Sequence, residues 1–249
     1  MAAVGADLKE SLAKWQFAKD LKKDEIAVTI EFKHIISRLT WHPKGDYFAT
    51  MASNLQSTNQ VVIHSLRKAS SQKPFSTTKG IIQCFAFHPT KPHFFAATHV
   101  SVFQYNLQKQ SIVKKYKSGA KWISSISIHP KGDNLILGTY DKKVLWFDMD
   151  MGGEKPYKSL KYHEKAIRAV NFHQGKFPLF ASASDDGSVN IFYGMVYNDL
   201  LQNALVVPVK VLKAHEKTAN GLGTMQCVWH PTQPWVFTAG ADGKIKLWA

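Results

Sequence analysis

Cysteine and arginine are both scarce in this sequence of 249 residues. The two cysteines, Cys84 and Cys227, stand in apolar, strand-like runs, which is typical of small core residues in a reducing compartment. Two cysteines in such contexts predict neither a disulfide nor a metal site. Only three arginines occur, so the 32 basic side chains are almost all lysines. Against 18 acidic side chains they give a net charge of +14.

The excess of lysine over arginine bears on what this chain binds. Lysine carries a flexible, strongly hydrated point charge, whereas arginine offers a planar fork that reads bases and phosphates. The balance therefore favours general attraction to a polyanion, with little specific base readout. A basic surface without a nucleic-acid partner is the alternative.

Long apolar runs are also missing. No stretch approaches the roughly 18 consecutive apolar residues of a membrane span, and residues 1–10 lack the basic segment and apolar core of a secretory signal. Hydrophobic residues nevertheless make up 45% of the chain, which is enough for a sizeable core. We therefore expect a folded protein with no membrane partner.

What the sequence does contain is a repeat. A short apolar strand ends in His-Pro, or once in His-Gln, at five places, with intervals of 46, 41, 44 and 57 residues: His42, His88, His129, His173 and His230. Three of the intervals match the length of a four-stranded propeller blade, and the fourth carries an insertion. A second strand, a tight turn that often contains Asp-Gly, and a third strand follow each marker. One such sheet cannot bury both faces alone, so copies stack radially.

These motifs resemble the WD40 family over about residues 26–249, which implies an all-β, WD40-type β-propeller. In that family a His before the first strand and an Asp in the turn before the third strand form a hydrogen-bonded brace, and a Trp closes it. The resemblance implies structural braces in the last two units, at His163, Asp186, His215, Asp242 and Trp248. Phe192 replaces the Trp in the fourth unit. In the third unit Asp141 matches, Phe147 holds the aromatic position, and Trp146 lies one residue early.

The repeat predicts about five blades, with outer strands near 26–32, 73–78, 110–116, 156–161 and 206–213. Rings of the WD40 family usually have seven blades, so we expect these five to be part of a seven-bladed ring. An unusual five-bladed ring is the alternative. Residues 1–25 do not fit the repeat, and Leu8, Leu12, Trp15 and Leu21 lie at helical spacing. That segment is either a short amphipathic helix or a tail.

Several stretches resemble one family in particular, the C-terminal propeller of the block-of-proliferation family of eukaryotic ribosome biogenesis proteins. They are residues 40–50, 121–148, 180–216 and 230–248. The run GMVYNDLLQNALVVPVKVLKAH, which starts at Gly194, is the most telling, because no structural rule of a propeller demands it. The resemblance implies a nucleolar and nucleoplasmic assembly factor. It would act with pescadillo and a second WD-repeat protein in large-subunit rRNA processing and pre-60S maturation.

The sequence predicts docking and no catalysis. It contains no nucleophile–base pair, phosphate-cradling loop or zinc spacing, and the marker histidines lie one per blade, too far apart to share an ion. We therefore expect no enzyme activity, cofactor, metal or small-molecule substrate. The partners expected are proteins and pre-rRNA within the pre-60S particle. A generic WD40 adaptor, such as a ubiquitin-ligase substrate receptor, is the alternative.

Lysine-rich segments are the candidate RNA-binding sites. They combine phosphate-seeking charge with neighbouring aromatic residues such as Tyr116 and Trp122. Alternatively, these lysines only block edge pairing of outer strands. The candidate RNA-binding residues are Arg67, Lys68, Lys114, Lys115, Lys121, Lys158 and Lys161.

The insertion at 194–213 is the candidate partner-binding surface, with Tyr197, Leu200 and Leu201 as its residues. It holds more apolar side chains than a connecting loop needs. Alternatively, Leu205 to Leu212 is the outer strand of the fifth blade, and 195–203 packs locally.

Overall fold

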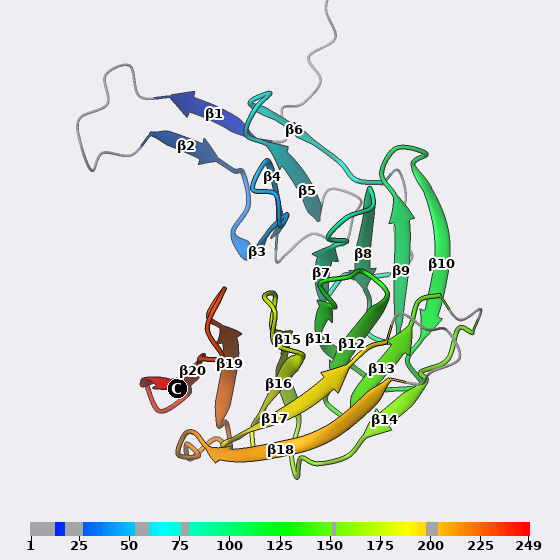
Figure 1. The fold of residues 1–249 in the computed structure, drawn as a ribbon. Coiled ribbons are helices and arrows are strands. Elements are labelled where there is room, and N and C mark those ends of the chain that lie inside the picture. Colours follow the sequence, from blue (N-terminus) through cyan, green and yellow to red (C-terminus); the bar gives the residue numbers. More distant parts are fainter. Residues whose placement is uncertain (1–12, 18–26, 53–59, 76–79, 151–152, 198–203) are drawn as a thin grey trace, which may run out of the picture. The chain divides into compact units, whose positions relative to one another are not determined.

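The computed structural model describes residues 13–17, 27–52, 60–75, 80–150, 153–197 and 204–249. All regular elements within these ranges are strands, and no helix there is long and apolar enough to cross a membrane. The chain divides into two compact units, Met1–Thr78 and Lys79–Ala249. Both units consist of antiparallel sheets whose strands follow chain order (Figure 1).

The first unit contains a two-stranded hairpin and one four-stranded sheet, which we term blade 1. Its strands are β1 (Lys14–Phe17), β2 (Val28–Glu31), β3 (Ile36–Trp41), β4 (Tyr47–Ala52), β5 (Val61–Ser65) and β6 (Ser70–Gln72). The buried His64 on β5 joins the strands on either side, because its Nε2 lies 2.8 Å from Thr50 Oγ1 and its Nδ1 lies 2.8 Å from Ser71 Oγ. The outer strand β6 ends at Gln72, so the prediction of an outer strand near 73–78 is wrong for residues 73–75, and residues 76–78 lie outside the described residues.

The hairpin corrects the prediction of a helix for one part of residues 1–25. Lys14–Phe17 is a strand, and it pairs antiparallel with β2 so that Trp15 lies opposite Ile30. The Trp15 indole N–H also donates to Ser71 Oγ at 2.9 Å. Pairing with a β-branched partner strand thus overrides the helical spacing of the apolar residues. Residues 1–12 and 18–25 lie outside the described residues.

The second unit contains four sheets, blades 2 to 5. Blade 2 is β7 (Cys84–Phe87), β8 (His93–Ala97), β9 (Ser101–Asn106) and β10 (Ser111–Lys117). Blade 3 is β11 (Ile123–Ile128), β12 (Asn134–Thr139), β13 (Val144–Asp148) and β14 (Lys158–Leu160). Blade 4 is β15 (Ile167–Phe172), β16 (Leu179–Ser184), β17 (Ser188–Met195) and β18 (Leu205–Lys213). Blade 5 is β19 (Thr224–Trp229), β20 (Val236–Gly240) and β21 (Ile245–Trp248).

The blades of the second unit stack through their first strands. β7 contacts β11, β11 contacts β15, and β15 contacts β19, while the outer strands β10, β14 and β18 each pair with the third strand before them (Figure 1). The prediction of an all-β fold of about five propeller blades is confirmed. The strand at 206–213 belongs to blade 4 and not to the blade that follows, because it pairs with β17.

Separate apolar clusters fill the spaces between these blades. Trp146 and Phe147 are neighbours on β13 and therefore point to opposite faces of blade 3. Phe147 is part of the cluster shared with blade 2, whereas Trp146 packs on Phe172 and Phe180 of blade 4. The position of Trp146 one residue early in the repeat thus places it in a different interface.

Both cysteines belong to these clusters. Cys84 lies between blades 2 and 3, and Cys227 lies between blades 4 and 5, each as a buried free thiol. The prediction that they are core residues is confirmed. Burial raises the pKa of the Cys227 thiol to about 12, so this thiol stays protonated and unreactive near neutral pH.

Two of the marker histidines, His88 and His173, join successive blades. The Nδ1 atom of His88 accepts a hydrogen bond from the backbone N–H of Lys91 at 2.9 Å, so Nε2 carries the proton and donates to the Gly132 carbonyl of blade 3 at 2.9 Å. His173 repeats this pattern in blade 4 and reaches the Gln233 carbonyl of blade 5 at 2.9 Å. At Gly132 a Cβ atom would lie 2.3 Å from the His88 ring, so this contact requires glycine.

His88 gives a prediction about acid stability. Burial, together with the charges of Lys91 and His93, lowers the pKa of His88 from 6.5 to about 4. The unfolded chain therefore binds this proton at a higher pH than the folded chain does. The stability that depends on neutral His88 is complete above about pH 6.5 and falls as the pH drops toward 4. Urea denaturation should show the free energy of unfolding declining over that window.

His88→Gln isolates this contribution. The variant removes the titrating ring, so its decline between pH 6.5 and pH 4 should be shallower than that of the unmodified chain. The difference between the two proteins at about pH 7.5 gives the constant effect of the lost hydrogen bonds. Parallel pH profiles for the two proteins would contradict the assignment.

Candidate functional site

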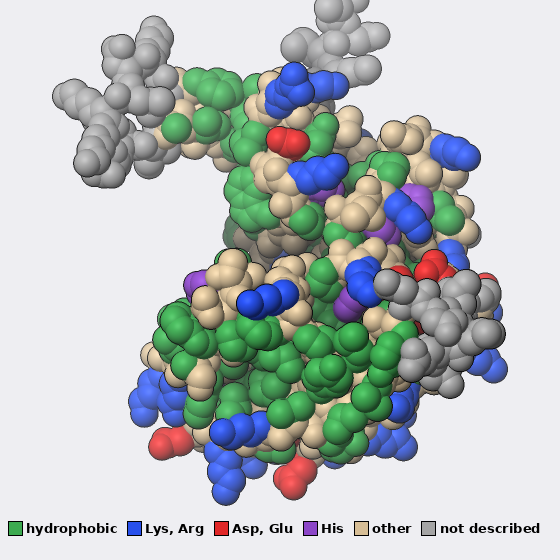
Figure 2. All heavy atoms as spheres, viewed as in Figure 1, with side chains coloured by type: hydrophobic (Ala, Val, Ile, Leu, Met, Phe, Trp, Pro, Cys, Tyr) green, Lys and Arg blue, Asp and Glu red, His purple; other side chains and the backbone are tan. Residues whose placement is uncertain are grey.

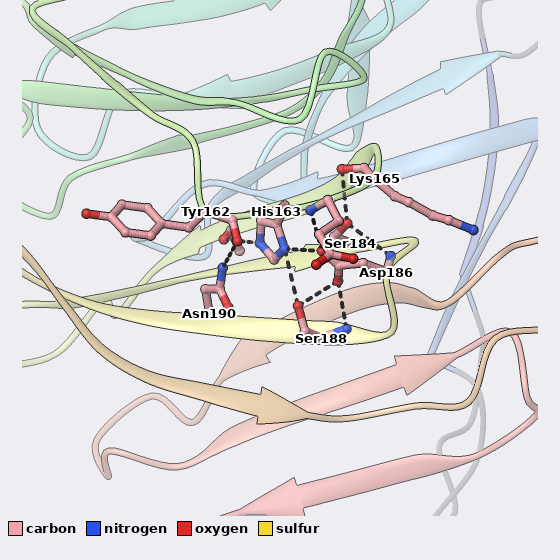
Figure 3. A network of polar contacts seen from close by, with 9 residues as sticks. Tyr162, His163, Lys165, Ser184, Asp186, Ser188 and Asn190 are labelled. Carbon is pink, nitrogen blue, oxygen red and sulfur yellow. Dashed lines mark hydrogen bonds and ion pairs between the residues drawn. The ribbon is translucent and has the colours of Figure 1, made fainter.

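A hydrogen-bonded brace fixes the loops at one end of blade 4. His163 precedes β15 and Asp186 lies in the turn between β16 and β17, with His163 Nδ1 2.9 Å from Asp186 Oδ2 (Figure 3). The other ring nitrogen lies 2.7 Å from Ser182 Oγ on β16. Ser188 at the start of β17 donates its hydroxyl to Asp186 Oδ1 at 2.6 Å. The brace thus joins the incoming loop to the second and third strands.

The brace keeps its carboxylate ionised. Burial alone would raise the pKa of Asp186, but hydrogen bonds from His163 and Ser188 outweigh burial and hold the pKa well below its usual range. The Glu164 backbone N–H also donates to this carboxylate at 3.0 Å. Both oxygens are therefore occupied by protein donors, as expected of a structural group.

Blade 5 carries the second brace. His215 Nδ1 lies 2.9 Å from Asp242 Oδ1, and His215 Nε2 lies 2.9 Å from Thr238 Oγ1. The Trp248 indole N–H donates to the same Thr238 hydroxyl at 3.1 Å. In blade 4, Phe192 has the position of this tryptophan and stacks on Phe180. The structure thus brings all five of the sequence-derived brace residues into two complete networks.

The candidate RNA-binding side chains do not form one cluster. In the second unit they are spread over blade 2 (Lys114 and Lys115, on β10), the loop before β11 (Lys121) and blade 3 (Lys158 on β14, and Lys161 just after it). Arg67 and Lys68 lie in the turn between β5 and β6 of the first unit. All are exposed except the half-buried Lys114. They are therefore separate points of positive charge on loops and outer strands.

Tyr116 does not have the stacking role that the sequence suggested. Its ring is fully buried, and its hydroxyl donates to Gln104 Oε1 at 2.8 Å. The Lys114 ammonium lies 5.0 Å from the centre of this ring and donates to the Met149 carbonyl at 3.2 Å. Lys115 lies over the Phe103 ring at 5.5 Å. This edge of blade 2 therefore offers charge without an open aromatic face.

A cavity of about 370 Å³ lies between blades 3 and 4, at the opposite end of β15 from the blade 4 brace. Three segments line it, namely the turns after β11 and β15 and the end of β17. Lys131 and Lys176 add positive charge to a lining that includes Phe177, Tyr193 and Met195. Sequence reasoning missed this cavity because its walls come from three separate segments between residues 129 and 196.

The insertion borders this cavity. Val196 lines it, and the half-buried Tyr197 follows directly, whereas Leu200 and Leu201 lie outside the described residues. Further on, Leu205–Lys213 is the outer strand β18 of blade 4, and Val207, Val209 and Val211 expose 41% to 62% of their surface. Figure 2 shows hydrophobic side chains gathered on this face of the second unit.

The described residues offer no set of three or more His, Cys, Asp or Glu side chains that would hold a metal ion. Their arrangement instead provides surfaces: lysine-bearing edges, fixed loops, and one apolar cavity with lysines in its lining.

Comparisons with known proteins agree with the repeat. The WD40 family, described as "WD domain, G-beta repeat", matches residues 154–192 and 206–249. A BOP1 homologue from Monosiga brevicollis, named as a ribosome biogenesis protein, is 50% identical over 235 residues, or 94% of this chain and 29% of that protein. ERB1 of Phaeosphaeria nodorum is 50% identical over 99% of this chain and 31% of its own length.

Bop1 of Danio rerio is 49% identical over 97% of the chain and 31% of its own length. The chain thus spans about a third of the length of these relatives. Over nearly its whole length, this chain is a WD40-repeat homologue of the BOP1/ERB1 family of ribosome biogenesis proteins.

Proposed function

We propose that this chain is a docking propeller of a ribosome assembly factor, acting in large-subunit rRNA processing and pre-60S maturation in the nucleolus and nucleoplasm. The observation that carries this proposal is an identity of about half the residues, over nearly the whole chain, to proteins named for ribosome biogenesis. These names do not favour the alternative of a generic WD40 adaptor. The partners proposed are pre-rRNA, a pescadillo-type factor and a second WD-repeat protein, and the mode of action is binding without catalysis.

The physical features of the chain support two kinds of contact. A net charge of +14 attracts the phosphates of an RNA partner from a distance, and Lys115, Lys121, Lys158 and Lys161 are among the exposed lysines. The cavity between blades 3 and 4 suits a different ligand. Its apolar lining with Lys131 and Lys176 fits an apolar side chain of a protein partner that is flanked by carboxylates.

Sedimentation of nuclear extract that contains a tagged form of this chain tests the role. We expect the chain to sediment with large-subunit rRNA precursors, because the exposed blades present the docking surfaces. A chain found only in the light fractions, although folded, would contradict the proposal for this part of the protein.

Three exposed lysines on or beside outer strands give a second prediction. We term them the lysine edges: Lys115 on β10, Lys158 on β14, and Lys161 just after β14. Changing Lys115, Lys158 and Lys161 together to Glu should weaken binding to single-stranded RNA and reduce the salt dependence of the affinity. Each lost phosphate contact should lower the slope of log affinity against log salt by roughly 0.7. The matched control changes Lys210, Lys213 and Lys244 to Glu and produces the same change in net charge. Equal losses in the two triple variants would show that total charge, and not these edges, governs binding.

Tyr197 gives a third prediction. Tyr197→Ala should lower recovery of a WD-repeat or pescadillo-type partner by about tenfold or more, as for an aromatic side chain at the centre of an interface. The free energy of unfolding should stay unchanged, because Tyr197 lies two residues beyond Met195, the last residue of β17. Tyr157→Ala, in the loop before β14, is the control. A loss of stability that parallels the loss of partner would assign Tyr197 to local packing.

A further inference from the structure

Four side chains from three consecutive blades of the second unit contact one another in a row. They are His99 after β8 in blade 2, Trp122 before β11 and Tyr140 after β12 in blade 3, and Arg168 on β15 in blade 4. The ring centres of His99 and Trp122 are 3.9 Å apart, and those of Trp122 and Tyr140 are 5.7 Å apart with nearly parallel planes. The Arg168 guanidinium lies 4.9 Å from the centre of the Tyr140 ring. We term this set the aromatic ladder.

The fold does not require the two central rings of the ladder. Equivalent backbone hydrogen bonds identify matching positions in three blades: Tyr140 N–H to the Trp122 carbonyl at 3.0 Å, Asp185 to Ala166 at 3.0 Å, and Ala241 to Gly223 at 2.9 Å. Where blade 3 has Trp122, the other two blades therefore have alanine and glycine. Both residues are also partly exposed to solvent, at 39% for Trp122 and 38% for Tyr140.

Blade 3 also differs from blades 4 and 5 in the turn between its second and third strands, two residues after Tyr140. Gly187 and Gly243 follow the brace aspartates of blades 4 and 5 with φ angles of +84° and +74°. At the same point blade 3 has Lys142, with φ +67°, after Asp141. A residue with a side chain is less favourable than glycine in this region of backbone conformation. An exposed lysine is thus kept next to Tyr140 in a backbone conformation that favours glycine.

Exposed lysines lie close in sequence to both central rings of the ladder. Lys121 directly precedes Trp122, and Lys142 follows Tyr140 by two residues. The two nearby carboxylates are occupied, because Asp141 accepts the Lys121 backbone N–H at 2.7 Å and Asp185 accepts Arg168 Nε at 2.7 Å. Arg168 also donates to the Tyr140 hydroxyl at 3.0 Å, so its plane is held over that ring.

We propose that the aromatic ladder is a stacking site for the bases of single-stranded RNA, with Lys121 and Lys142 contacting the phosphates. Bases of single-stranded RNA stack on solvent-exposed aromatic side chains, and a strand that carries a phosphate at each step satisfies lysines on either side. The proposal rests on the proposed function, since it names the site at which this chain holds unpaired pre-rRNA. It differs from the lysine edges, which attract RNA by charge alone.

The primary test compares Trp122→Ala with Trp235→Ala, because these two indoles are equally exposed, at 39% and 38%. The probe is a fluorescein-labelled single-stranded 12-mer of oligouridine or oligoadenine, read by fluorescence anisotropy, with an RNA duplex of the same length alongside. Trp122→Ala should weaken single-strand binding about five- to a hundredfold. Because stacking releases no counterions, the salt dependence should keep its slope. Trp235→Ala should bind as the unmodified chain does.

Lys142→Gly separates binding from folding. It introduces glycine, which the equivalent turns of blades 4 and 5 contain. The free energy of unfolding should therefore be unchanged or higher. Its affinity for the single strand should nevertheless fall by about two- to fivefold, with a smaller salt slope, as expected for one lost phosphate contact. This variant keeps the test decisive if Trp122→Ala fails to fold. Trp122→Phe, which keeps a ring, should restore most of the affinity.

Three results would overturn the stacking site. If Trp122→Ala binds RNA as tightly as the unmodified chain while the lysine-edge triple variant binds more weakly, the stacking site is contradicted and the proposed function is not. If the unmodified chain binds no single strand, both the stacking site and the proposed binding of pre-rRNA are contradicted. Binding of a fluorescein-labelled oligoglutamate peptide that depends on Trp122, with no RNA binding, would assign the ladder to an acidic protein ligand.

Discussion

Every sheet in this chain has two faces to bury, and that constraint determines which residues remain for function. Side chains alternate along a strand, so neighbours such as Trp146 and Phe147 belong to different interfaces, one on each side of blade 3. His88 and His173 add directed hydrogen bonds between blades 2 and 3 and between blades 4 and 5. In blades 2 to 4 most residues of the inner strands are thereby committed to neighbouring blades. Loops, turns and outer strands are what other molecules can reach on these blades.

The braces explain why one blade is free to differ from the others. In blades 4 and 5 the loop before the first strand and the turn before the third are held together by His163 with Asp186 and by His215 with Asp242. Blade 3 keeps the aspartate, Asp141, but pairs it with a backbone N–H, and it places Trp122 and Tyr140 side by side in the same two segments. A stacked aromatic pair thus occupies loops that blades 4 and 5 fix with a buried His–Asp hydrogen bond. A ligand site built there leaves the packing of the strands unchanged.

The sequence predicted the features that depend on local chemistry. Acid-Gly turns and alternating strands need only neighbouring residues or one repeat length, so the blades could be predicted from these patterns, and the two braces were expected from the resemblance to the WD40 family. Lys14–Phe17 was misjudged because its partner strand, and not its own apolar spacing, determines its conformation. Tyr116 was misjudged because the packing of blade 2 against blade 3 decides which side of β10 is buried. The cavity and the aromatic ladder were missed because each joins segments of different blades that no local pattern connects.

The composition of the chain explains why such sites matter for a protein with a net charge of +14. Lysine attracts any polyanion, and that attraction weakens with salt and carries little information about sequence or strandedness. Selectivity must therefore come from shape and from uncharged contacts. β15 extends from Arg168 at the aromatic ladder to Phe172 in the wall of the cavity, so the two shaped surfaces lie near opposite ends of one strand. Occupants of the two surfaces would not compete for the same atoms, and a rigid blade would hold them at a fixed separation. A docking propeller with such a blade can hold RNA and protein in a defined relative position without any moving part.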